Sequence, residues 1–453
     1  MAASRWMRAP VFAALVAASL PAAADLTEIE TRIVERVKSR SAQAIELLER
    51  SVRVNSGTLN IEGVREVGRI FAAELEPLGF RTRWAEMPAE MNRAGHLIAT
   101  REGSHGKRVL LIGHLDTVFE KQSPVQLWER SGNKVRGQGV VDMKGGDVAL
   151  IEALRALHEL GLLADTTISV VFTGDEERLG LPHSVSRRDL IDAAKRSDVA
   201  LVFEGSRRLR SGGDQAHVAR RGSSSFTLEV TARPAHSSGM FSPGVGLGAI
   251  YEGARILNAF REQVAEPGLS FSPGVALGGT VVSFDDVLAS GTAFGKSNVI
   301  PRLFTVRSDM RFLDIAQRDR ARAKMREIVA QNLPGTGAEI KFNDGYPPMP
   351  ATEGNRGLLA AYSRVSQDAG YGPVDAGDAS QGGASDVQFV APYVDAIDSI
   401  GPWGSGSHTV DEQLDIPSVE RSAVRAALLI YRLTRGGSPL GDRIKQPPGS
   451  VPQ

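Results

Sequence analysis

Three apolar runs in this 453-residue chain each end next to side chains that can bind a metal ion. The runs occupy residues 109–113, 168–174 and 199–203. They are followed, in order, by His114, by the acids Asp175-Glu176-Glu177 and by Glu204. Short, β-branched apolar runs are typical of buried strands in a parallel sheet. Open α/β sheets bind ligands outside the carboxyl ends of their strands, so the sequence predicts a metal site at one sheet edge.

Composition narrows the chemistry of that site. The chain has no cysteine, which excludes a disulfide framework and thiolate ligands, so a metal must be bound by His, Asp and Glu. Lys plus Arg and Asp plus Glu are both 53, so the formal net charge is zero and we expect no nucleic-acid partner. A chain of 453 residues is too long for one core and predicts more than one domain.

The first 24 residues have the pattern of an export signal. Arg5 and Arg8 precede an apolar stretch at 11–20, and Ala22-Ala23-Ala24 offers a small-residue cleavage site before Asp25. The sequence therefore predicts a signal peptide at 1–24 and a periplasmic or secreted mature chain. An uncleaved membrane anchor is the alternative, but the apolar stretch is shorter than the roughly 20 residues that a span needs. No other stretch is long enough, so we expect no stable membrane span.

Strand and helix patterns predict two kinds of domain. After Gly103 apolar runs alternate with helical patterns such as 148–160, which favours a parallel α/β sheet. From residue 218 apolar and polar residues alternate instead, as in a half-exposed antiparallel strand. The order from there to 345 is strand, helix, strand, strand, helix, strand, with the middle strands expected at 280–284 and 304–311. This is the order of a ferredoxin-like split unit.

These patterns predict a small domain inserted into a larger one. The larger, discontinuous domain spans 25–217 and 346–436, and the inserted domain spans 218–345. Gly345-Tyr346-Pro347-Pro348 is the expected exit hinge. Residues 437–453 are rich in Gly and Pro and are expected to form a loose tail.

The acids at 175–177 are the sharpest chemical feature. Three adjacent carboxylates after an apolar strand repel one another unless cations neutralise them. One Glu as a metal ligand and its neighbour as a general base is a natural division of work. An acidic surface turn is the alternative.

Other candidate residues each also fit an ordinary structural role. Asp142 lies at an expected strand-to-helix turn and suits an N-cap, or a carboxylate that bridges two metals. In His114-x-Asp116 the acid can fix the imidazole tautomer, or it can cap a helix. His408, in a Gly-rich loop, and His236, in a polar turn, are either exposed residues or functional ones. As a functional residue, His236 would stabilise a developing oxyanion.

Together the motifs resemble one family, the co-catalytic zinc peptidases and deacylases that include glutamate carboxypeptidase, succinyl-diaminopimelate desuccinylase, acetylornithine deacetylase and aminoacylase. The resemblance extends from about residue 30 to 435. The motifs are, in chain order, His114-x-Asp116, Gly137-x-Gly139-x-x-Asp142-Met143-Lys144-Gly145-Gly146, Asp175-Glu176-Glu177, Glu204, Ala235-His236-Ser237-Ser238, Asn298-Val299-Ile300-Pro301, Gly382-Gly383-x-Ser385-Asp386 and Gly406-Ser407-His408.

The resemblance implies a fold and a metal centre. The fold is α/β, a zinc-peptidase catalytic domain with a mainly parallel sheet plus an inserted ferredoxin-like α+β lid that also makes a homodimer contact. Two Zn²⁺ ions per chain are implied, with Co²⁺ or Mn²⁺ as alternatives. One would be held by His114, Asp142 and Glu204. The other would be held by Asp142, Glu177 and His408, with Asp142 bridging.

The resemblance also implies catalytic and substrate-binding roles. Glu176 would be the general base and later the proton donor, and Asp116 would orient His114. His236 would polarise the scissile carbonyl, in dimeric members at the neighbouring subunit's site. Asn298, Gly383 and His236 would contact substrate.

The substrate expected from the resemblance is a small peptide or N-acyl amino acid. Glu at position 204 is typical of carboxypeptidases and deacylases in this family, so an exported metallocarboxypeptidase similar to glutamate carboxypeptidase is the first hypothesis. Family members often carry Arg at the hinge, where this chain has Tyr346, which cannot form a bidentate charged pair with a carboxylate. Arg302 and Arg311 are candidate substitutes. An aminoacylase or other deacylase, a dipeptidase, and a non-catalytic exported binding protein remain the alternatives.

Overall fold

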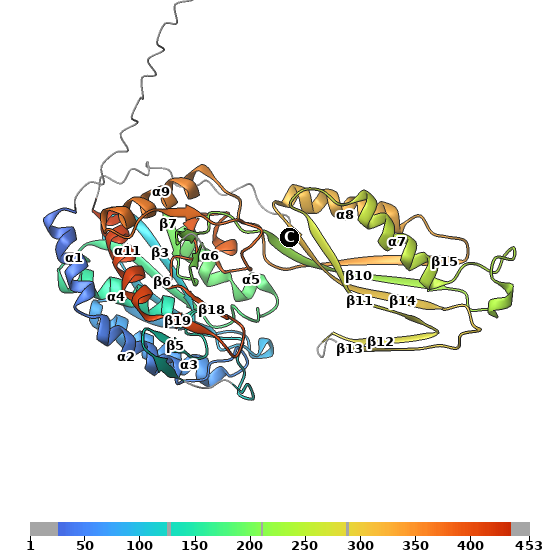
Figure 1. The fold of residues 1–453 in the computed structure, drawn as a ribbon, viewed down its shortest axis with the longest axis horizontal. Helices are drawn as coiled ribbons and strands as arrows, with labels where there is room; N and C mark the ends of the chain where they lie inside the picture. The colour runs from blue at the N-terminus through green and yellow to red at the C-terminus, as the bar shows by residue number, and fades with distance from the viewer. Residues whose placement is uncertain (1–25, 125–127, 210–211, 287–289, 436–453) are drawn as a thin grey trace, which may run out of the picture.

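A computed structural model describes residues 26–124, 128–209, 212–286 and 290–435. The predicted signal peptide at 1–24 and tail at 437–453 lie outside these residues. Figure 1 shows two bodies, a rounded α/β body and an elongated domain that extends to its right. The elongated domain is called the lid below.

A six-stranded sheet forms the centre of the α/β body, in the order β1-β2-β6-β3-β7-β17. Four strands run parallel, namely β3 (His105–His114), β6 (Thr166–Thr173), β7 (Val199–Val202) and β17 (Asp395–Ile397). At one end of the sheet, β2 (His96–Arg101) pairs antiparallel with β6 and with the edge strand β1 (Arg81–Ala85). The mainly parallel α/β sheet expected from the sequence is therefore confirmed, with an antiparallel edge.

Helices cover both faces of this sheet (Figure 1). Leu111 belongs to the apolar core on one face, whereas Leu110 and Ile112 belong to the core on the other, which is why the run reads as continuously apolar. The first face packs against α1 (Glu28–Lys38), α2 (Ser41–Val52), α3 (Ile61–Leu75), α4 (Lys144–Glu159), α9 (Glu353–Asp368) and α11 (Ile416–Thr434). The second packs against α6 (Arg188–Lys195) and α10 (Val387–Val390). Among the helices of the described residues, none has the length and apolar character needed to cross a bilayer.

A second small sheet positions two functional loops. It has the order β18-β19-β5-β4 and contains β4 (Glu129–Ser131), β5 (Lys134–Arg136), β18 (Gly404–Ser405) and β19 (Gln413–Asp415). Because β19 pairs with β5, the loop 406–412 lies beside the turn 137–143. The remaining short elements of the body are α5 (His183–Ser186), β8 (Arg207–Arg208), β9 (Asp214–Ala216) and β16 (Val374–Ala376).

The lid is an antiparallel four-stranded sheet with two helices on one face. Its sheet order is β11-β14-β10-β15, and β10 pairs antiparallel with both β14 and β15. The elements are β10 (Gly222–Ala232), α7 (Ala249–Gln263), β11 (Ser270–Gly279), β14 (Leu303–Phe312), α8 (Ile315–Val329) and β15 (Thr336–Asp344). Phe226, Leu228 and Val230 of β10 are buried in the lid core, as their alternation predicts. The element order and the sheet order are those of a ferredoxin-like unit.

Two local expectations were wrong. The second lid strand is β11 at 270–279, whereas the expected strand at 280–284 is β12 (Val281–Asp285), which forms a separate hairpin with β13 (Ser290–Phe294). A register shift between Pro273 and Val275 interrupts the alternation that would have marked β11. In addition, a turn rather than a strand precedes Asp142, because residues 139–143 lead from the small sheet directly into α4.

Candidate metal centre

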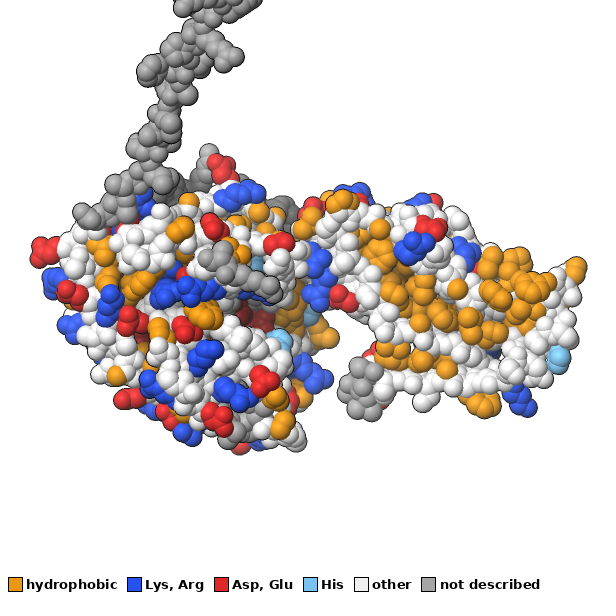
Figure 2. All heavy atoms as spheres, in the orientation of Figure 1, with side chains coloured by type: hydrophobic (Ala, Val, Ile, Leu, Met, Phe, Trp, Pro, Cys, Tyr) orange, Lys and Arg blue, Asp and Glu red, His pale blue; other side chains and the backbone are white. Residues whose placement is uncertain are grey.

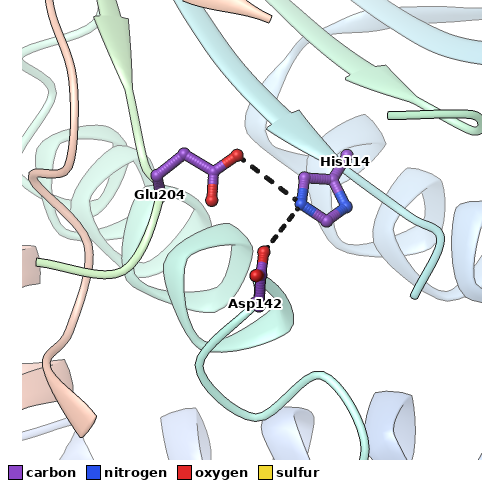
Figure 3. Close-up of side chains that lie close together, drawn as sticks. All are labelled: His114, Asp142 and Glu204. Carbon is purple, nitrogen blue, oxygen red and sulfur yellow. Dashed lines mark hydrogen bonds and ion pairs between the residues drawn. The ribbon is translucent and has the colours of Figure 1, made fainter. Parts of the chain in front are cut away.

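Strand ends bring the predicted ligands to one edge of the large sheet. His114 is the last residue of β3, and Glu204 lies just beyond the end of β7. Glu177 follows the end of β6, which lies on the other side of β3. Figure 3 shows His114, Asp142 and Glu204 pointing toward one another.

Five predicted ligands form two groups that share Asp142. In the first, the Nε2 atom of His114 lies 3.2 Å from Oδ1 of Asp142 and 3.6 Å from Oε1 of Glu204. In the second, the Nε2 atom of His408 lies 3.0 Å from Oδ2 of Asp142 and 3.1 Å from Oε2 of Glu177. The candidate ligand atoms within each group all lie within 4.8 Å of one another. Asp142 therefore presents a different carboxylate oxygen to each group.

Glu412 holds the turn that carries Asp142. Its Oε1 accepts hydrogen bonds from the backbone N–H groups of Val141 (2.8 Å) and Asp142 (3.1 Å), and its Oε2 accepts one from Gly139 (2.9 Å). Burial raises the pKa of Glu412 to about 8, and the charge of Asp142 adds to the effect. Glu412 was not predicted from the sequence, where its only signal is an acid in the same loop as His408.

Asp116, just beyond the end of β3, is hydrogen-bonded to the backbone of the acidic turn at 175–177. Its carboxylate accepts hydrogen bonds from the backbone N–H of Glu176 (3.0 Å) and Glu177 (3.1 Å) and from the Thr58 hydroxyl (2.6 Å). The Nδ1 atom of His114 lies 3.0 Å from the main-chain carbonyl of Asp116 and 3.5 Å from its Oδ1. Asp116 therefore contacts the imidazole as well as the backbone of the two glutamates.

Asp175 has a different partner from the other two acids. It is buried and forms an ion pair with Arg187, which also donates from Nε to Asp386 at 2.6 Å. The Asp175 carboxylate also accepts from the Gly180 N–H at 2.8 Å. The cation that the sequence led us to expect is therefore supplied at Asp175 by the protein itself, as the guanidinium of Arg187.

The carboxylates of Glu177 and Glu204 lack enough positive charge from the described residues to remain ionised easily. Burial and the charge of Asp142 raise the pKa of Glu204 well above its usual range and that of Glu177 to about 7. Burial lowers the pKa of His114, but its contacts with Asp116 and Asp142 outweigh burial and raise it. The Oε1 atom of Glu177 is buried and has no hydrogen-bond partner among the described residues. Two divalent cations would neutralise this cluster, and its imidazole and carboxylate donors fit Zn²⁺.

The two ligand groups open into one cavity of about 450 Å³. Glu176, Glu204 and His408 line it, together with Tyr346 from the hinge and Gly383 from the Gly-rich loop. A cavity of this size suits a small molecule.

The predicted lid residues lie together but outside this cavity. The main-chain carbonyl of Asn298 accepts a hydrogen bond from the Ser237 N–H at 2.9 Å, and His236 forms a bridge with Val299. His236 and Asn298 are both exposed, and neither lines the cavity. Their catalytic and substrate-binding roles therefore stay predictions.

Arg302 and Arg311, the candidate substitutes for an arginine at the hinge, do not line the cavity either. Arg311 of β14 donates to Asp309 at 2.9 Å, and Arg302 is exposed on the lid. Arg207, which follows Glu204 in the chain, is exposed and lines the cavity.

The chain is similar to known proteins over most of its length. The model of the family described as "Peptidase family M20/M25/M40" matches residues 110–432. Carboxypeptidase G2 of Pseudomonas sp. (strain RS-16) is 27% identical over 437 residues, which cover 95% of this chain and 98% of that protein. Succinyl-diaminopimelate desuccinylase of Acidiphilium cryptum (strain JF-5) is 27% identical over 405 residues, covering 86% and 97%.

Solved structures share the fold at lower identity. A tripeptidase from Staphylococcus aureus has a TM-score of 0.68 at 16% identity and covers 87% of this chain and 99% of its own. A dinuclear metal binding peptidase of the M20 family from Bacillus subtilis has a TM-score of 0.61 at 14% identity, covering 88% and 99%. These similarities extend over both the α/β body and the lid.

Proposed function

Because this chain belongs to peptidase family M20/M25/M40 and is a hydrolase of amide bonds, we propose that it is an exported dinuclear zinc enzyme that acts on small peptides or N-acyl amino acids. Release of a C-terminal residue is the favoured reaction. The single observation that carries the proposal is the shared carboxylate of Asp142, which faces His114 with one oxygen and His408 with the other.

The chain's own residues supply the proton chemistry. Bound cations would polarise the scissile carbonyl and lower the pKa of a water molecule. Glu176 lines the cavity beside the ligand Glu177, where its carboxylate can accept a proton from the attacking water. The same carboxylate then delivers that proton to the nitrogen of the leaving amine. Asp116 fixes the backbone of Glu176 during both transfers, because it accepts a hydrogen bond from the N–H of that residue.

Glu204 and the cavity volume support the substrate class. The family resemblance links Glu at this position with carboxypeptidases and deacylases, and a cavity of about 450 Å³ holds a dipeptide-sized molecule. The relatives carboxypeptidase G2 and succinyl-diaminopimelate desuccinylase bear the names of these two activities. His236 is proposed to polarise the scissile carbonyl when the lid brings it to a site, and Asn298 and Gly383 to contact substrate.

Export and dimer formation are parts of the same proposal. Export is supported by the sequence pattern at 1–24. A homodimer through the lid is supported by its apolar surface, which Figure 2 shows as hydrophobic side chains gathered over that domain. Large exposed apolar side chains of the lid are Phe241, Ile250, Tyr251, Val281, Phe294, Leu313 and Ile315.

Hydrolysis of a matched substrate panel tests the proposal. The panel contains free dipeptides, N-acetylated dipeptides and N-acyl amino acids, each assayed after chelation and after re-addition of Zn²⁺, Co²⁺ or Mn²⁺. A carboxypeptidase cleaves N-acetylated dipeptides, and a deacylase cleaves N-acyl amino acids. Cleavage restricted to peptides with a free amino terminus would instead establish an aminopeptidase or dipeptidase, and hydrolysis that survives complete metal removal would contradict the metal centre.

A further inference from the structure

The hinge between the two domains is a small antiparallel ladder. The chain enters the lid at Ser223 and leaves it at Tyr346, and the Ser223 N–H donates to the Tyr346 carbonyl at 2.8 Å. In return, the Tyr346 N–H donates to the Ser223 hydroxyl oxygen at 3.1 Å. Arg220 and Met349 pair through both of their backbone groups at 2.9 Å. The two crossing segments therefore move as one unit.

Gln388 of α10 fastens this ladder to the α/β body. Its side-chain amide donates to the main-chain carbonyls of both Arg221 and Pro347, one on each crossing segment. Gln388 is fully buried, so the amide has a fixed position. A change in lid orientation must therefore bend the few residues next to this anchor, and Tyr346 is one of them.

Tyr346 is also the hinge side chain that reaches the proposed general base. Its hydroxyl donates to the main-chain carbonyl of Glu176 at 2.7 Å and lies 3.4 Å from Oε1 of the same residue. The phenol ring packs against Phe389, with ring centroids 5.2 Å apart. The peptide groups of Glu176 are thus held on two sides, its N–H by Asp116 of the body and its carbonyl by Tyr346 of the hinge.

We propose that Tyr346 is a positioning residue that makes the location of the Glu176 carboxylate depend on the orientation of the lid. A phenol has one O–H group to donate. The shorter hydrogen bond of the Tyr346 hydroxyl goes to the main-chain carbonyl of Glu176, and its carboxylate lies farther away. A movement of the hinge displaces this hydroxyl and, through it, the backbone that carries the base. A displacement of about 1 Å in a catalytic group can lower turnover by about 100-fold. The proposal rests on the proposed function, because it assigns Glu176 the role of base.

Tyr346→Phe is the direct test, since it removes the hydroxyl and keeps the ring that packs on Phe389. We expect kcat to fall about tenfold, with KM, metal content and thermal stability close to those of the unchanged protein. Tyr362→Phe is the matched control, because the buried Tyr362 hydroxyl donates to the main-chain carbonyl of Ile400 at 3.3 Å and does not line the cavity. We expect Tyr362→Phe to leave kcat unchanged.

The possible results separate this proposal from the proposed function. If the unchanged protein hydrolyses its substrate and Tyr346→Phe has the same kcat, the positioning role is wrong although the enzyme assignment stands. If Tyr346→Phe raises KM about tenfold at constant kcat, the phenol contacts substrate and the proposal is again overturned. If the unchanged protein hydrolyses none of the substrates, the proposed function itself is contradicted.

A double-mutant cycle tests the link to the hinge. Ser223→Ala removes the hydroxyl that accepts from the Tyr346 N–H, outside the catalytic site. We expect this change to lower kcat about threefold in the unchanged background and to have no further effect in Tyr346→Phe, because both act through the same phenol. Additive losses in kcat would mean that the hinge does not act through Tyr346. Ser223→Ala alone also keeps the test valid if Tyr346→Phe does not fold.

Discussion

The two domains hold their predicted functional residues in opposite ways. In the α/β body, the side chain of His114 is 1% exposed, and the carboxylates of Asp116 and Glu412 fix the surrounding backbone by accepting hydrogen bonds from its N–H groups. On the lid, His236 is exposed and lies outside the cavity. The half of the proposed site that contains the metal ligands is therefore formed within a single domain, whereas the proposed role of His236 would require lid movement or a second subunit.

Removal of Asp142, which belongs to both ligand groups, should have the largest effect on metal binding in the α/β body. We expect Asp142→Ala to weaken metal binding at both positions by more than about 100-fold and to abolish turnover, since both groups lose an oxygen. Metal content by elemental analysis checks this, with Asp411→Ala as an acidic control at an exposed ion pair. Retention of one tightly bound ion would mean that Asp142 serves a single position.

Removal of the base should separate chemistry from metal binding. Glu176→Gln keeps the shape of the side chain, so we expect full metal content and a fall in kcat of about 10³-fold. Glu353→Gln, at the exposed start of α9, is the matched control. Turnover near that of the unchanged protein would remove Glu176 as the base.

Removal of His236 tests the catalytic role that is proposed for the lid. We expect His236→Ala to lower kcat about 100-fold and to leave the metal content intact, because an oxyanion donor is lost and no ligand is. The exposed His158 supplies a control in His158→Ala. A loss of metal in His236→Ala would contradict the lid role.

Co-expression of His236→Ala with Glu176→Gln tests whether the lid acts on its own chain or on the neighbouring subunit. A mixed dimer contains one site with an intact base and the partner's intact lid histidine, so activity reappears if the lid acts on the neighbouring subunit. If the lid acts on its own chain, the mixture is as inactive as either variant alone.

The smallest expected effect concerns His217, a buried residue at the body end of the hinge. Burial, together with the charge of Arg220, lowers the pKa of His217 to about 4, and the charge of Asp398 opposes this shift. The stability that depends on neutral His217 is present above its unfolded pKa near 6.5 and is lost as the pH falls toward 4. We expect about 2 kcal/mol less unfolding free energy at pH 5 than at pH 7 from this residue.

Urea denaturation of the unchanged protein and of His217→Gln at both pH values isolates this contribution. The other charged groups near His217 are Arg207 and Asp378, and both are retained in the variant. An equal pH dependence in the two proteins would show that His217 does not titrate on unfolding.

The sequence predicted the strand ends well because open α/β sheets place ligand-binding residues just outside the carboxyl ends of their strands. Apolar runs and the acids after them identified β3, β6 and β7 and the order in which His114, Glu177 and Glu204 follow them. Local periodicity also predicted the order of lid elements. It failed at β11, where a register shift breaks the alternation, and the strand that it predicted at 280–284 is β12, which pairs with β13 instead of joining the four-stranded lid sheet.

Partners that are distant in the chain could not be predicted from local patterns. Arg187 neutralises Asp175, and Glu412 holds the turn of Asp142, and both contacts depend on tertiary packing. The hinge residue Tyr346 was noted only for the arginine that it replaces. Its hydrogen bond to the Glu176 carbonyl appears only when the two crossing segments are placed beside the acidic turn.

The unequal exposure of the two imidazoles has a consequence for ion exchange. The side chain of His408 is 55% exposed on the loop between β18 and β19, whereas that of His114 is 1% exposed beneath the sheet edge. Solvent and chelators therefore reach the group that contains His408 more readily than the group that contains His114. We expect stepwise depletion during dialysis, with a half-loaded protein in which the outer ion leaves and reloads first.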